Sequence, residues 1–122
     1  MGIQEERENF EKKLFEAGYL LIKDTGERNI YGRTFENYYV HFDIADVPHS
    51  DGTRVAAYVW YNSPDNGREL VRSRSFGTFD GKNIENAQRE FAEIIRDDFI
   101  PSRAKHMALP KDLEAFLTKE KK

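Results

Sequence analysis

The sequence predicts an α+β fold, a four-stranded antiparallel meander packed against helices, in the order α-β-β-β-β-α-α across a single domain of residues 1–122. Two observations predict this fold. Arg54–Asn62 and Glu69–Phe79 are strand-like stretches on either side of Ser63–Gly67, a segment rich in turn-forming residues. The stretch that follows, 83–99, repeats apolar residues three and four positions apart, as a helix does when one side is buried against a sheet.

The first third of the chain predicts one helix followed by strands. We expect the helix from Gln4 to Ala17, with Gly18 as its C-terminal stop. Tyr19–Lys23 is a short apolar strand, and 27–33 fits either a strand or a loop. Thr34–Ile44 alternates apolar and polar residues, which is typical of a half-buried strand. Its core-facing set is expected to be Tyr38, Val40, Phe42 and Ile44.

The strand Arg54–Asn62 divides its side chains between two faces. Val55, Ala57 and Val59 have one parity, and Tyr58 and Trp60 have the other. Because 83–99 offers an apolar stripe, we expect the first set to pack against Phe91 and Ile95.

The return strand has no clear apolar face. Arg72 and Arg74 share one parity with Phe76, while Ser73 and Ser75 have the other. A β-bulge between Arg74 and Phe76 would reconcile the pattern, but nothing in the sequence marks its position.

The C-terminal part predicts a stop, a connector and a last helix. Pro101 ends the helix over 83–99, and Pro110 begins a helix that runs to Thr118. Residues 119–122 are expected to be a frayed tail.

Composition favours an intracellular protein. The chain has 19 basic and 22 acidic side chains, a net charge of −3, and no cysteine. Without cysteine there are no disulfides or thiolate nucleophiles, which is typical of a reducing, cytoplasmic compartment. A dedicated nucleic-acid binder more often has a basic excess. No apolar run reaches the length of a membrane span, so no membrane partner is expected.

The candidate site is the sheet face opposite the long helix. By parity, its binding residues are predicted to be Tyr39, His41, Tyr58 and Trp60, joined by Arg72 and Arg74 if no bulge intervenes. Aromatic rings beside guanidinium groups stack on bases, and the same residue types dominate protein-interface hot spots. The alternative is that the first or last helix covers this face and makes it a second core.

Metal and catalytic motifs are missing from the sequence. His41 and Asp43 point the same way on a strand and would need His49 or Asp46 to complete a metal site, but no fixed metal-ligand spacing is present. No nucleophile elbow or phosphate loop occurs either. We therefore predict no metal, no cofactor and no enzymatic activity.

One stretch resembles a known family. RVAAYVWYNSP, followed by SFGTFDGKNIENAQREFAEI, resembles the strand-strand-helix of AP2-type DNA-binding domains, with Gly77-Thr78-Phe79-Asp80 at the step into the helix. The resemblance covers about 40 residues and implies a three-stranded sheet that binds the major groove of DNA. Ser73 and Ser75 stand where that family has basic residues, which counts against DNA binding.

Two classes of function remain open. The first is a small non-enzymatic binding module for a protein partner, of the inhibitor, adaptor or regulator type that phages and plasmids encode. The second is a nucleic-acid or nucleotide binder that uses the aromatic and arginine face. Net charge and the lack of a basic stripe favour the first. The oligomeric state is left open.

Overall fold

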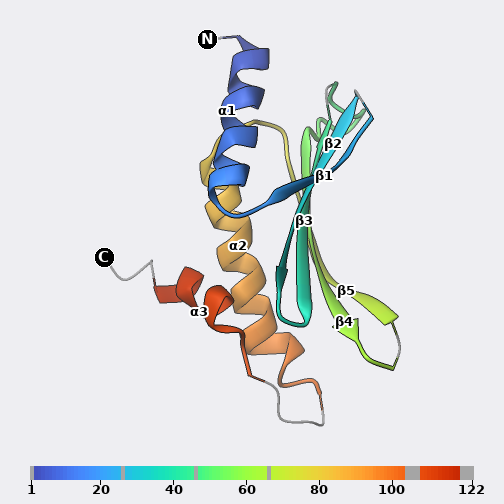
Figure 1. The fold of residues 1–122 in the computed structure, drawn as a ribbon, viewed down its shortest axis with the longest axis vertical. Helices are drawn as coiled ribbons and strands as arrows, with labels where there is room; N and C mark the ends of the chain where they lie inside the picture. The colour runs from blue at the N-terminus through green and yellow to red at the C-terminus, as the bar shows by residue number, and fades with distance from the viewer. Residues whose placement is uncertain (1, 26, 46, 66, 104–107, 119–122) are drawn as a thin grey trace.

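A five-stranded antiparallel sheet forms one layer of the molecule and the helices form the other (Figure 1). This computed structural model describes residues 2–25, 27–45, 47–65, 67–103 and 108–118. The strands lie side by side in chain order, β1-β2-β3-β4-β5. The elements are α1 (Ile3–Glu16), β1 (Leu20–Asp24), β2 (Arg28–Phe35), β3 (Tyr38–Ala45), β4 (Val55–Ser63), β5 (Gly67–Phe76), α2 (Lys82–Ile94), the π-helix η1 (Ile95–Phe99) and α3 (Lys111–Thr118).

The predicted α+β class with an antiparallel meander is confirmed, but the prediction of four strands is wrong. Of the stretch over 27–33, residues 28–33 are part of β2, and the strand predicted over 34–44 is divided by a turn at Glu36 and Asn37. Glu36 has a φ of 54°, a left-handed conformation that normally favours glycine. Because glutamate gives no turn signal there, the sequence pattern hides the reversal.

The core lies between the sheet and the helices. Val55, Ala57 and Val59 of β4 are fully buried, as are Phe91 and Ile95, and all five belong to one apolar cluster. The predicted core set of β3 is also buried, at 2% exposure or less. The predicted docking of the helix on the hairpin is therefore confirmed.

Each helix covers its own part of the sheet. The Glu11 carboxylate of α1 accepts hydrogen bonds from Asn29 Nδ2 and Tyr31 Oη of β2, at 2.9 and 2.6 Å. Helix α2 lies toward β5, where Glu90 forms ion pairs with Arg72 and Arg74, at 3.6 and 3.0 Å. In Figure 1 the helices lie on the same side of the sheet.

A β-bulge in β5 decides which way its arginines point. Trp60 pairs with Leu70, but the neighbouring Val59 pairs with Arg72, so Val71 is the extra residue. A bulge places two residues opposite one and shifts the alternation beyond it. Arg72 and Arg74 therefore face α2 and do not join the aromatic side, since the condition that no bulge intervenes is not met; the bulge lies at Val71 rather than between Arg74 and Phe76.

A second bulge lies in β1, at the edge of the sheet. Leu21 pairs with Tyr31 and Lys23 pairs with Ile30, which leaves Ile22 without a register partner on β2. Leu20, Leu21 and Ile22 are 63%, 48% and 56% exposed. The tail predicted over 119–122, the possible metal ligand Asp46 and the turn residue Asn66 lie outside the described residues.

Candidate functional site

The helix-free side of the sheet holds four of the six predicted binding residues. Tyr39 and His41 of β3 lie opposite Trp60 and Tyr58 of β4 in the strand register. All four side chains are half-buried. We call these four residues the aromatic face. No helix among the described residues lies over it (Figure 1). The structure therefore does not have the alternative arrangement, in which the first or last helix covers this face and makes it a second core.

The rings of the aromatic face contact one another in a continuous cluster. The centroid of His41 lies 4.6 Å from that of Tyr58 and 6.2 Å from that of Trp60, with the latter pair stacked at 17°. The Tyr58 and Trp60 rings are stacked 6.3 Å apart, and Tyr39 lies 5.9 Å from His41. Ring contacts of this kind restrict the side chains, so a partner would meet a surface that is already ordered.

His41 is held as a neutral imidazole at the centre of this cluster. Trp60 Nε1 donates a hydrogen bond of 3.2 Å to His41 Nδ1, which requires Nδ1 to be unprotonated. Burial lowers the pKa of His41 below its ordinary value, and the Arg68 charge lowers it further, while Asp43 acts in the opposite direction. The imidazole therefore acts here as a hydrogen-bond acceptor.

Gly32 of β2 lets Tyr39 lie across the backbone of the neighbouring strand. A Cβ at Gly32 would lie 1.9 Å from the Tyr39 hydroxyl oxygen and 2.3 Å from Ile22 Cδ1. The missing side chain therefore makes room for the tyrosine of β3 and the isoleucine of β1. As a result, the aromatic face is continuous with the exposed apolar residues of β1.

Two arginines border the aromatic face, and neither was predicted. The Arg68 guanidinium lies 4.9 Å from the centroid of the Tyr39 ring, and its Nε donates to Asn62 Oδ1 at 3.2 Å. Arg28 forms a two-pronged ion pair with the buried carboxylate of Asp43. The hairpin turn could have predicted the position of Arg68. If Ser63 pairs with Gly67, then Arg68 pairs with Asn62.

The remaining predicted residues are separated from this face. Arg72 and Arg74 lie on the helix-covered side, paired with Glu90. Ser73 lies opposite Tyr58 in the register, so the positions that are basic in AP2-type domains are occupied by serine on the helix-free side. Charge on the aromatic face therefore comes from Arg68 and from the Arg28–Asp43 pair.

Among the described residues, no three His, Asp or Glu side chains gather in a way that could hold a metal ion. No helix in the described ranges is long and apolar enough to cross a membrane.

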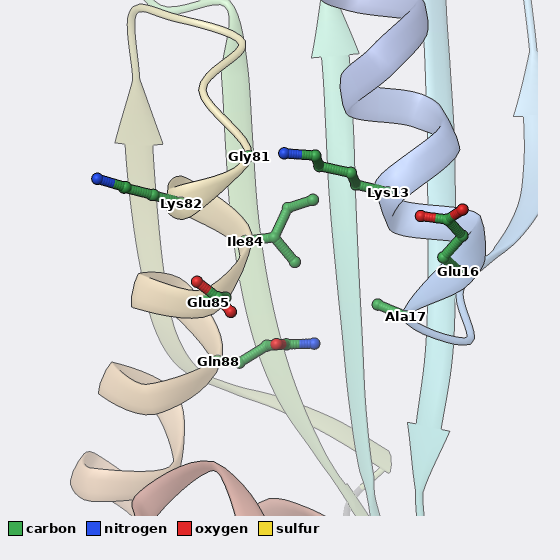
Figure 2. A pocket seen from close by; sticks show the side chains of 8 residues that line it. All are labelled: Lys13, Glu16, Ala17, Gly81, Lys82, Ile84, Glu85 and Gln88. Atoms are coloured by element: carbon green, nitrogen blue, oxygen red, sulfur yellow. The ribbon is translucent and has the colours of Figure 1, made fainter. Parts of the chain in front are cut away.

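A separate hollow of about 370 Å³ lies between α1 and the start of α2 (Figure 2). Its charged lining is balanced, with Lys13 and Lys82 beside Glu16 and Glu85. Figure 2 shows the Lys13 side chain reaching toward Gly81, where a Cβ would lie 2.7 Å from its amine. The hollow contains no ring and no clustered charge of one sign, so the aromatic face is the stronger candidate.

Comparison of the chain with family models, curated proteins and solved structures finds no match in any of the three. The resemblance to AP2-type domains stays a prediction that none of these comparisons supports. The aromatic face itself is therefore the feature of this molecule that indicates a function.

Proposed function

We propose that the protein is a non-enzymatic binding module that docks a protein partner on its aromatic face. The observation that carries this proposal is the ordered cluster of His41, Tyr58 and Trp60 on a sheet side that no described helix covers. Tyrosine, tryptophan and arginine are enriched among the residues that dominate the binding energy of protein interfaces. An inhibitor, adaptor or regulator would use such a surface without any catalytic group.

Charge supports a protein partner over a nucleic acid. A nucleic-acid interface needs several free cations along a backbone track. Arg72 and Arg74 point toward α2, so the aromatic face lacks two of the predicted cations. The charge of Arg28 is paired with the carboxylate of Asp43. Arg68 over Tyr39 is the remaining arrangement that suits a base or a phosphate, and it keeps a nucleic acid as the second candidate.

The test begins with capture of partners by the purified protein, followed by measurement of affinity for the partner that is recovered. Trp60→Ala is expected to weaken that affinity by about 2 kcal/mol or more, as an anchor residue does. Because Trp60 is half-buried, its loss should destabilise the fold by less than a core truncation would.

The matched control is Arg74→Ala, which removes a side chain of similar size from the helix-covered side. Its affinity for the partner should equal that of the wild type. Equal loss in both variants, or no loss in either, would contradict docking on the aromatic face. Co-purified nucleic acid with a steep salt dependence that Arg68→Ala reduces would support the second candidate instead.

A further inference from the structure

The two edges of the sheet are built differently. The outer strand β5 carries Arg68, Glu69, Arg72 and Arg74, and charged side chains of this kind discourage an edge from pairing with another chain. The opposite edge, β1, carries three consecutive apolar residues, Leu20, Leu21 and Ile22. Each is about half exposed or more, and the charged residues of this strand, Lys23 and Asp24, lie at its C-terminal end, so its N-terminal part is an exposed apolar stretch.

We infer that β1 pairs antiparallel with β1 of a second copy of this chain, forming a two-fold symmetric dimer with a continuous ten-stranded sheet. An open strand edge offers a row of backbone N–H and C=O groups, and a second strand is the partner that can pair with them in series. A strand that pairs with itself antiparallel satisfies the symmetry of an isologous dimer.

The bulge in β1 makes the strand self-complementary. Against β2, Ile22 and Lys23 together face the single residue Ile30. With the two-fold axis at Leu21, Leu21 lies opposite its own copy, and Leu20 lies opposite the bulged pair Ile22–Lys23. Leu20 and Lys23 pair with Gly32 and Ile30 on the helix-free side, so the matched residues share a face.

The helix layer supplies the rest of the contact. A five-residue strand alone buries less than the roughly 1,200 Å² of a typical stable interface. Helix α1 covers this side of the sheet through Glu11, and its last turn carries Phe15 with 64% of its surface exposed. Two copies related at β1 bring their α1 helices together, which adds the Phe15 side chains to the interface.

The consequence is a bivalent molecule. All helices stay on one side of the extended sheet, so both copies of the aromatic face lie on the other side. Two linked sites can bind a partner that carries two epitopes far more tightly than one site does. The dimer does not depend on the proposed function, because β1 pairing uses none of the four residues of the aromatic face.

The experiment is sedimentation velocity of the full chain over a concentration series. We expect a monomer–dimer equilibrium with a dissociation constant of about micromolar or weaker, since the contact is small. Leu21→Lys, at the axis, and Ile22→Lys, next to it, should each raise that constant by about tenfold or more, because each places a charge in the apolar part of the contact. Both side chains are about half exposed, so at a concentration far below the dissociation constant, where the wild type is also monomeric, the thermal midpoint should change little.

Leu70→Lys is the matched control, because Leu70 is 45% exposed but lies on β5. It should leave the dimer intact, as should Trp60→Ala. Amide hydrogen exchange at Leu20–Asp24 should slow as concentration rises. A protein that stays monomeric at about millimolar concentration, or a dimer insensitive to Leu21→Lys, would overturn the inference, whatever the fate of the aromatic face.

Discussion

The two faces of the sheet use alternate residues of the same strands for opposite purposes. In β4, Val55, Ala57 and Val59 have no exposed surface, whereas Tyr58 and Trp60, which alternate with them, are half-buried. The covered face is aliphatic and aromatic core, and the open face holds polar-edged rings in mutual contact. Large rings on an uncovered side add little to a core that is already complete. Along the same strand, therefore, side chains of one parity stabilise the fold, and side chains of the other parity form the candidate binding surface.

The largest expected effect is on the covered face. Phe91→Ala should destabilise the protein by about 3–5 kcal/mol, because it leaves a cavity where the ring packs within the core cluster. Urea denaturation followed by circular dichroism measures the loss. A free energy of unfolding close to that of the wild type would mean that α2 does not depend on its contact with β4.

On the open face, His41 should make the surface sensitive to pH. The folded protein holds the pKa of His41 below the ordinary value of about 6.5 that it has in the unfolded chain. Its contribution to stability is therefore complete above about pH 6.5 and is lost as the pH falls through the lower folded value. The loss should be of the size of the Trp60 hydrogen bond, about 0.5–1.5 kcal/mol.

Trp60 is the one tryptophan in the chain, so its fluorescence reports this titration directly. Its emission should change as His41 gains a proton and Nδ1 stops accepting the hydrogen bond. His41→Gln should remove the transition. A transition at or above pH 6.5, or one that persists in His41→Gln, would contradict the buried neutral imidazole. Blue-shifted emission that resists an aqueous quencher at neutral pH would argue against an open face.

The smallest effect is expected for the ion pair between Arg74 and Glu90, at the edge of the covered face. Arg74 Nε lies 3.0 Å from Glu90 Oε1, but the two side chains are 48% and 31% exposed. Water screens such a pair, so Arg74→Ala should cost less than about 1 kcal/mol, and less still in high salt. Urea denaturation at two ionic strengths measures this. A loss of several kcal/mol would mean that the arginine stem, rather than its charge, supports α2.

Local patterns were enough to predict most of the secondary structure. The alternation of Tyr38, Val40, Phe42 and Ile44 identified the buried side of β3, and the repeat through Phe91 and Ile95 identified that of α2 and η1. Four of the six candidate residues were placed together for the same reason. Alternation with period two and repetition with period 3.6 are properties of a single segment, so they can be detected without knowing its neighbours.

Features that depend on pairing were decided only by the tertiary structure. The turn at Glu36 adopts a conformation that glutamate does not signal, and it divides one predicted strand into two. The bulge at Val71 exists only relative to β4, where Trp60 and Val59 face Leu70 and Arg72. One extra residue there reverses the face of every later side chain, because strand parity is counted from a hydrogen-bonded neighbour rather than along the chain. The sequence by itself determined which residues alternate; contact between strands decided the side on which Arg72 and Arg74 lie.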